Sequence, residues 1–429
     1  MDVGRTPTDS GQLTTDISMK DFKPFRAQKQ MKELMAGHFR EVDEASRDPG
    51  RKVAWCTSVG PAELLLSLGY AVYYPENHGA LLGASRRAND FIPLANALGY
   101  SPDICSYLTS DIGSYLARDT PLKKAYGLEG PPRPDVLVYN TNQCRDVQDW
   151  FSFYSREFGV PAVGVNSPTK VGEVTRTLVE GMVAQYKALI PPLEAIAGTR
   201  FDPDRFREVL SLSAQTTRLW KACLFAGRHR PSPLTFFDAT ILMGPAVVLR
   251  GTPGPVAFYR ELLAELEERA AVGAGAVEGE RHRIYWDGMP VWGKLRELSD
   301  FFQELRTAVV VSTYCNSWIF EAFEEADRGV DPFEAMARAY LELFIVRSDA
   351  VKEEVIGRLA REFAVDGIVY HDAKTCPCNS NTRYGLPQRL KEKSGLPYVV
   401  FYGDLNDLRC FSEEQTRTNI EAFVEQLGG

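Results

Sequence analysis

The sequence lacks the features that would direct the protein to a membrane or to nucleic acid. Its most apolar stretch, residues 240–249, is too short to span a bilayer and is interrupted by Gly244 and Pro245. The first residues are polar and contain no apolar core of a signal peptide. A net charge of −8 argues against the basic face that nucleic acid or an anionic membrane surface requires. We therefore expect a cytoplasmic protein that binds neither.

Histidine is scarce, whereas cysteine is plentiful. The 429 residues include only 5 histidines but 8 cysteines. In a cytoplasmic protein these cysteines should be reduced thiols, which leaves them available as metal ligands. At 44% hydrophobic and 25% charged residues, the composition is that of an ordinary globular protein with two or three domains. The cysteines are Cys56, Cys105, Cys144, Cys223, Cys315, Cys376, Cys378 and Cys410.

The order of predicted elements indicates an α/β protein with two similar halves. Short apolar strands alternate with amphipathic helices in residues 51–169 and again in residues 236–429, a pattern typical of parallel sheets covered by helices. We expect two Rossmann-like parallel-sheet domains in these ranges, joined by a helical connector over residues 170–235. Residues 1–50 should contain a disordered start and an N-terminal helix over Phe25–Asp43.

Some helix boundaries can be predicted within this plan. One helix is expected over Gly79–Ala97 and another over Ser317–Glu325, and the helices of the connector should break at Pro191-Pro192 and at Asp202-Pro203. Gly288–Leu295 has the spacing of a P-loop, but Leu295 replaces the hydroxyl residue that holds Mg²⁺. We therefore expect no ATP binding there.

Cysteines follow three of the predicted strands. Because ligands sit at the carboxyl ends of parallel strands, these thiols could converge on a metal centre. Each cysteine taken alone could instead be a small buried hydrophobe. The cysteines are Cys144 after the strand over residues 135–140, Cys315 after residues 307–312, and Cys376 with Cys378 after residues 366–370.

Short motifs distributed along the chain carry a resemblance to a known family. They are Pro61–Leu66, Tyr74–His78, Asp103–Tyr107 with Asp111–Gly113, Asn142–Cys144, Gly288–Trp292, His371–Cys376, Gly403-Asp404 and Asp407–Arg409. Together they resemble the 2-hydroxyacyl-CoA dehydratase and benzoyl-CoA reductase family, over nearly the whole chain from about Phe22. Arg230–Pro233 and Ser312–Phe320 look most like the B-type subunit of the ATP-dependent benzoyl-CoA reductases.

The resemblance implies an iron–sulfur cofactor. Members of the family hold a [4Fe-4S] cluster on three cysteines of one subunit, and the matching positions here are Cys105, Cys144 and Cys376. Cys378 is a rival to Cys376 for the last position. Cys56 and Cys315 could lie around the cluster or serve as ligands of a larger one.

The resemblance also implies residues that handle protons. Glu76 and Ser58 match positions that line the acyl-CoA pocket in relatives, where a carboxylate and a hydroxyl could relay a proton. His78 and His371 could donate a hydrogen bond to the thioester carbonyl or to a cluster sulfide. A purely structural role is the alternative for Ser58 and both histidines.

The function that the resemblance implies is that of an oxidoreductase subunit. It would pass low-potential electrons to benzoyl-CoA and reduce the ring to a dienoyl-CoA. Its partners would be an acyl-CoA substrate, a sister cluster-bearing subunit, an ATP-hydrolysing activator and a ferredoxin as upstream donor. The alternatives are a 2-hydroxyacyl-CoA dehydratase subunit, a double-cubane electron carrier that reduces small molecules, and a scaffold subunit without a cluster.

Overall fold

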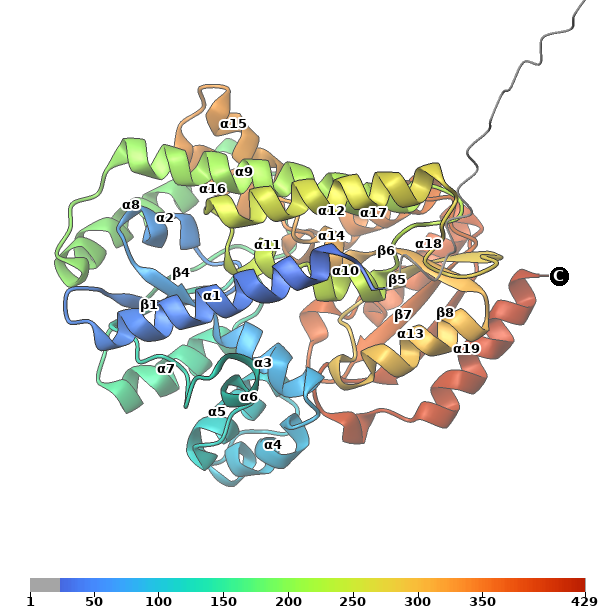
Figure 1. The fold of residues 1–429 in the computed structure, drawn as a ribbon, viewed down its shortest axis with the longest axis horizontal. Helices are drawn as coiled ribbons and strands as arrows, with labels where there is room; N and C mark the ends of the chain where they lie inside the picture. The colour runs from blue at the N-terminus through green and yellow to red at the C-terminus, as the bar shows by residue number, and fades with distance from the viewer. Residues whose placement is uncertain (1–23, 429) are drawn as a thin grey trace, which may run out of the picture.

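The computed structural model describes residues 24–428 and contains two parallel β-sheets of four strands each (Figure 1). The first sheet has the strand order β2-β1-β3-β4 and the second has the order β6-β5-β7-β8. The prediction of an α/β protein with two parallel sheets is confirmed, and the predicted disordered start lies outside the described residues. That the two domains are Rossmann-like stays a prediction, because strand order alone does not establish it. The strands are β1 (Val53–Cys56), β2 (Ala71–Tyr73), β3 (Val136–Asn140), β4 (Ala162–Val165), β5 (His282–Asp287), β6 (Thr307–Ser312), β7 (Gly367–Ala373) and β8 (Tyr398–Gly403).

Helices cover the two sheets because the strands are apolar along their length. Every residue of β1 and of β6 is buried, and a strand buried on both faces needs packing partners on both sides. In the first half these helices are α1 (Ala27–Arg47), α2 (Ala62–Ser67), α3 (Pro75–Ala84), α4 (Ala88–Ala97), α5 (Ser106–Ala117), α6 (Leu122–Tyr126) and α7 (Asp146–Phe158).

The remaining helices connect the halves or belong to the second one. The predicted connector is helical and consists of α8 (Arg176–Ala197) and α9 (Pro203–Phe225). The second half contains α10 (Phe236–Leu242), α11 (Gly244–Val248), α12 (Pro253–Ala271), α13 (Leu295–Glu304), α14 (Thr313–Asn316), α15 (Glu324–Asp327), α16 (Pro332–Leu341), α17 (Asp349–Glu362), α18 (Leu386–Ser394) and α19 (Glu413–Leu427).

Long helices tie the two halves together. α9 and α12 pack side by side and run along one side of both sheets (Figure 1). α1 packs on β1 and β2 of the first half and on α11 and α12 of the second. The N-terminal helix is therefore part of the contact between the halves. No helix in residues 24–428 is long and apolar enough to cross a bilayer.

Three predicted helix boundaries are wrong. The single helix expected over Gly79–Ala97 is two helices, because the chain leaves α3 through Arg86 in the left-handed region, at φ 61°. The helix expected over Ser317–Glu325 is replaced by short segments on either side of residues 317–320. α8 continues through Pro191-Pro192, where the helix is exposed and water can reach the carbonyl groups that the prolines leave unbonded.

Replacing Gly113 with alanine is expected to destabilise the protein. Gly113 lies on α5, where an added Cβ would come within 2.0 Å of the Phe91 carbonyl oxygen on α4. The two helices would have to move apart, which should lower the free energy of unfolding by about 2–3 kcal/mol. Urea unfolding measures this change. Gly37→Ala is the matched control, because Gly37 lies inside α1 with open space around it and alanine should stabilise that helix by about 0.5–1 kcal/mol. Equal effects of both substitutions would contradict the prediction.

Candidate functional site

A cavity of about 800 Å³ opens between the two sheets. Loops from the carboxyl ends of β1, β3, β5 and β7 reach it, and they contribute Ser58, Cys144, Met289 and Cys376. β1 and β3, like β5 and β7, are the neighbouring strands at which the strand order reverses. Such switch points are where open α/β sheets bind ligands, so this cavity is the candidate site.

Three cysteines line this cavity from three separate segments. Cys105 precedes α5, Cys144 precedes α7, and Cys376 lies between β7 and a 3-10 turn over Pro377–Asn379. Burial raises the pKa of all three thiols well above its usual value. The charge of a second thiol adds to the shift in each case, with Cys376 acting on Cys105, Cys105 on Cys144, and Cys144 on Cys376. The three thiols therefore line one cavity, although they come from segments far apart in the sequence.

The cavity offers three thiols that could serve as ligands of a metal centre. Within residues 24–428, no group of three or more Cys, His, Asp or Glu side chains lies close enough to hold one metal ion. An iron–sulfur cluster needs a wider spacing, since each thiolate binds a different iron. Bound iron would also deprotonate the thiols, and its positive charge would offset the repulsion among the resulting thiolates.

The other candidate cysteines lie outside the cavity lining. Cys378 is exposed, so Cys376 is the cysteine of this loop that shares the cavity with Cys105 and Cys144. Cys56 is fully buried at the end of β1. Cys315 is buried with its Sγ 3.6 Å from Thr240 Oγ1, and burial raises the pKa of its thiol to about 11.

Glu76 and Ser58 meet at the wall of the cavity. The backbone N–H of Ser58 donates a short hydrogen bond to Glu76 Oε2, and both residues line the cavity. Burial raises the pKa of Glu76 to about 7, against the opposing effect of the hydrogen bonds from Ser58. A carboxyl group with this pKa can both give and take a proton near neutral pH.

A buried ion pair holds the turn that carries Ser58. The carbonyl oxygen of Gly60 accepts hydrogen bonds from Arg250 Nη2 (3.1 Å) and from the Tyr340 hydroxyl (2.7 Å). Arg250 and Tyr340 also contact opposite oxygens of the Glu63 carboxylate, at 2.9 Å and 2.7 Å. An added Cβ at Gly60 would lie 2.7 Å from Cys56 Sγ, so the turn has little freedom to shift. The geometry of Ser58 is therefore set by contacts from both halves.

Replacing Glu76 with glutamine is expected to change how stability depends on pH. The pKa of Glu76 is raised from 4.5 to about 7 on folding, so between these values the folded protein binds the additional proton. The free energy of unfolding should therefore fall as pH rises, by about 3 kcal/mol across this window. In the Glu76→Gln protein this contribution should be absent. Urea unfolding of both metal-free proteins at about pH 5 and about pH 8 measures the difference, and equal pH slopes would contradict it.

The structure does not bring the two candidate histidines to the cavity lining. His78 is buried, with its Nδ1 against the Asp111 carboxylate and its Nε2 2.7 Å from Thr120 Oγ1. Asp111 also accepts hydrogen bonds from Trp150 and Tyr154, at 2.8 Å and 2.6 Å. This network joins α3, α5 and α7, and the hydrogen-bonding role predicted for His78 toward the substrate or cluster stays a prediction.

His371 is enclosed in the core of the second half. Its side chain is fully buried, its ring stacks on Phe401, and its Nδ1 is 2.6 Å from the Met289 carbonyl oxygen. Its Nε2 has no hydrogen-bond partner among the described residues. Met289 lines the cavity and His371 does not, so the hydrogen bond to the Met289 carbonyl oxygen connects His371 to the site.

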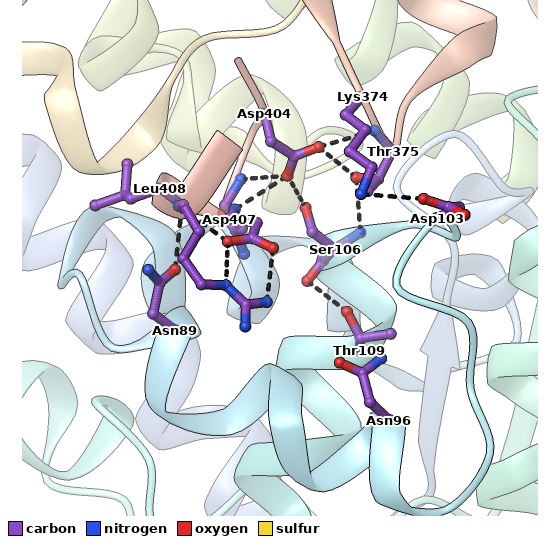
Figure 2. A network of polar contacts seen from close by, with 12 residues as sticks. Asn89, Asn96, Asp103, Ser106, Thr109, Lys374, Thr375, Asp404, Asp407 and Leu408 are labelled. Carbon is purple, nitrogen blue, oxygen red and sulfur yellow. Dashed lines mark hydrogen bonds and ion pairs between the residues drawn. The ribbon is translucent and has the colours of Figure 1, made fainter. Parts of the chain in front are cut away.

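Asp404 joins the two cysteine loops that come from different halves (Figure 2). One carboxylate oxygen accepts a hydrogen bond from the Ser106 hydroxyl, next to Cys105. The other accepts from the backbone N–H and hydroxyl of Thr375, next to Cys376, at 2.8 Å and 2.6 Å. The Ser106 N–H also donates directly to the Thr375 hydroxyl, at 3.0 Å. This fully buried carboxylate fixes the separation of Cys105 and Cys376.

Sequence reasoning missed several residues of the cavity wall. The Trp292 indole N–H donates a short hydrogen bond to the Tyr107 hydroxyl, which closes a contact between the halves beside Cys105. Both aromatic residues stand at the ends of motifs singled out in the sequence, so the motifs already contained the signal. Helices α10 and α11 also line the cavity, through Phe237 and Val247 among others. Their apolar sequence is indistinguishable from that of core helices.

Comparisons with known proteins find similar sequences over nearly the whole chain. A family model described as "2-hydroxyglutaryl-CoA dehydratase, D-component" matches residues 57–427. The alpha subunit of (R)-2-hydroxyisocaproyl-CoA dehydratase from Clostridioides difficile is 31% identical over 92% of this chain and 94% of its own. The alpha subunit of lactoyl-CoA dehydratase from Anaerotignum propionicum is 29% identical over 92% of this chain and 96% of its own. The B-type subunit of benzoyl-CoA reductase from Thauera aromatica is 26% identical over 92% of this chain and 93% of its own.

Proposed function

Because the chain belongs to the 2-hydroxyglutaryl-CoA dehydratase D-component family, we propose that it is the subunit that binds an acyl-CoA thioester beside a [4Fe-4S] cluster. Cys105, Cys144 and Cys376 would hold this cluster. The observation that carries the proposal is the meeting of these three thiols with Glu76 and Ser58 in one cavity. The similar proteins are named as subunits of enzymes. We therefore propose that this chain forms a stable complex with a sister subunit.

The proposed reaction is dehydration of a 2-hydroxyacyl-CoA, with reduction of benzoyl-CoA as the second candidate. Three dehydratase alpha subunits are 29–31% identical to the chain, the benzoyl-CoA reductase subunit is 26% identical, and the alpha subunit of (R)-2-hydroxyglutaryl-CoA dehydratase is 24% identical. The highest identities belong to dehydratases, although the ranges of the two kinds of enzyme overlap. The resemblance of Ser312–Phe320 to the reductase subunit keeps the second reaction open. Dehydration moves no net electrons, whereas ring reduction consumes two electrons and two protons.

In either reaction a [4Fe-4S] cluster, when bound, would supply single electrons of low potential. We propose that an ATP-hydrolysing activator and a ferredoxin deliver those electrons to the complex. Glu76 would hold or release the proton that the substrate exchanges, because the pKa of its carboxyl is raised to about 7 by burial. Ser58 would orient that carboxyl through its backbone N–H. The apolar cavity would exclude water from the reacting atoms.

The test is a product assay with the complete complex. The chain is purified without oxygen together with its sister subunit, then supplied with activator, ATP and a reduced electron donor. Loss of water from a 2-hydroxyacyl-CoA would support dehydration, and gain of hydrogen by benzoyl-CoA would support ring reduction. Mass spectrometry of the CoA esters separates the two products. If neither substrate changes while the complex holds iron and the activator hydrolyses ATP, the proposal is wrong.

A further inference from the structure

Three aromatic side chains meet in the cavity where the two halves join. Tyr107 lies on α5 of the first half, Trp292 begins the 3-10 turn before α13, and Tyr314 lies on α14, directly after β6. All three line the cavity. The Trp292 indole N–H donates to the Tyr107 hydroxyl, and the rings of Trp292 and Tyr314 stand edge to face with their centroids 6.2 Å apart. No step of the proposed reaction uses either tyrosine.

The Tyr314 hydroxyl lies near the groups of the proposed reaction. Burial raises the pKa of Tyr314, and the nearby charge of Cys315 adds to the shift. The charges of Glu76 and Cys376 raise this pKa further. An acyl group placed between Glu76 and the thiols therefore has the Tyr314 hydroxyl beside it. Since a tyrosine ionises at roughly pH 10 even in water, this hydroxyl keeps its proton at neutral pH.

The hydrogen of the Tyr314 hydroxyl is available to a ligand. The Tyr107 oxygen accepts from Trp292, and the Tyr107 hydroxyl interacts with that of Tyr314. This interaction acts to lower the pKa of Tyr314, as a hydrogen bond donated to its oxygen does. No atom of residues 24–428 accepts a hydrogen bond from Tyr314 in return. Because the side chain is partly exposed and lines the cavity, its hydrogen can point into the cavity.

Buried contacts hold the residues on both sides of Tyr314. The Thr313 hydroxyl donates a short hydrogen bond to the Asp287 carboxylate. The Cys315 carbonyl oxygen accepts from the Trp220 indole N–H at 3.2 Å. With the backbone fixed before and after it, the Tyr314 ring stays directed at the cavity.

A buried polar network that the proposed reaction does not use supports this segment. The Asn381 side chain donates to both oxygens of the Asp287 carboxylate at 3.1 Å, and Lys352 Nζ donates to the Asn381 oxygen at 2.9 Å. All three side chains are buried. Burying a lysine and a carboxylate costs free energy, and here their hydrogen bonds fix Thr313 and with it Tyr314.

We propose, on the basis of the proposed function, that the Tyr314 hydroxyl donates a hydrogen bond to the carbonyl oxygen of the bound thioester. When the thioester takes up one electron from the low-potential donor, no bond breaks and the added negative charge is shared with that oxygen. A donor at this position stabilises the charged form more than the neutral ester. Tyr107 is then a positioning residue, because its hydrogen bond to the Tyr314 oxygen leaves the Tyr314 hydrogen free for the substrate.

Infrared difference spectroscopy tests this contact without turnover. 2-Hydroxyisocaproyl-CoA and benzoyl-CoA, each with an isotope label on the thioester carbonyl carbon, are bound to the iron-loaded complex with its sister subunit, without activator or ATP. A hydrogen bond weakens the C=O bond, so the carbonyl band should lie at lower wavenumber in the parent than in Tyr314→Phe. The parent also gives a test that needs no variant, since its band should lie below that of the same ester in an aprotic solvent.

Tyr126→Phe is the matched control. Tyr126 on α6 lines the same cavity, but its ring stacks on Phe39 with the centroids 4.2 Å apart. Burial alone raises the pKa of Tyr126, without a contribution from Glu76 or the cysteines. Removing this hydroxyl should leave the carbonyl band where it is in the parent.

Turnover by the complete complex measures the energetic contribution of the contact. With saturating activator, Tyr314→Phe should lower kcat by about a hundredfold and change KM for the ester by less than about threefold. Tyr107→Phe should lower kcat less, because the Tyr314 hydroxyl remains. An unchanged kcat in Tyr314→Phe would contradict a role in the reaction.

The outcomes separate this inference from the function on which it rests. A bound ester whose carbonyl band is the same in the parent and in Tyr314→Phe overturns the inference and leaves the proposed function in place. A larger band shift in Tyr107→Phe than in Tyr314→Phe would assign the donor to Tyr107 and also overturn it. If neither ester binds more tightly than free CoA, the proposed function fails and the inference fails with it.

Discussion

Replacement of Cys144 by serine is expected to remove the iron from the protein. Under the proposed assignment Cys144 is one of three thiolate ligands of the cluster. The variant would have only two of these ligands left. The parent protein should contain about four irons and the variant essentially none. Iron and acid-labile sulfide analysis, with electron paramagnetic resonance of the reduced protein, measures the loss.

Cys223→Ser is the matched control for this experiment. Cys223 is fully buried on α9, where its Sγ is 3.5 Å from the Tyr259 carbonyl oxygen, and it does not line the cavity. That variant should keep its iron. About eight irons in the parent would favour the double-cubane alternative instead. A parent protein without iron would leave only the scaffold alternative.

Asp404→Ala is expected to be the most destabilising single substitution near the site. The Asp404 carboxylate accepts hydrogen bonds from the Ser106 hydroxyl, from the N–H and hydroxyl of Thr375, and from the N–H groups of Asn406 and Asp407. Alanine would leave these buried donors without a partner, at a cost of about 4 kcal/mol in the free energy of unfolding. Cys105 and Cys376 would also lose their fixed separation, so iron content after reconstitution should fall.

Asp407→Ala separates the bridging role of Asp404 from a local one. Asp407 lies three residues further along and its side chain accepts only from Arg409 among the hydrogen bonds of the described residues. Its loss should cost about 1 kcal/mol and leave the iron content unchanged. Urea unfolding of the metal-free proteins and iron analysis of the reconstituted ones measure both effects. Similar behaviour of the two variants would contradict the role assigned to Asp404.

The parts of the fold that could be predicted are those with strong local patterns. β3 and α7 follow from an apolar run and from a helical period, and their observed bounds agree closely with the prediction. Position at a strand end pointed to Cys144, Cys315, Cys376 and Cys378, of which Cys144 and Cys376 line the cavity. The set of Cys105, Cys144 and Cys376 is the one that the resemblance to the family implies. Their place in one cavity agrees with that expectation.

Other features depend on tertiary contacts that no local pattern records. The division between α3 and α4 occurs at Arg86, a residue with no intrinsic preference for the left-handed conformation that it adopts. The sequence cannot distinguish a catalytic histidine from a buried one. In the structure His78 belongs to a buried hydrogen-bond network and His371 stacks on Phe401. α10 and α11 line the cavity, but their apolar sequence would be the same if they packed in a core, so the sequence does not reveal the cavity.

The division of the three cysteines between the halves has a consequence for biosynthesis. Cys105 and Cys144 belong to the first half, and Cys376 lies after β7, with β8 and Asp404 still to follow. A ribosome synthesises these segments in order, so a nascent chain presents two thiols of the proposed set long before the third. Assembly of the proposed cluster would therefore require that the segment after β7 has been synthesised and has packed against the first half.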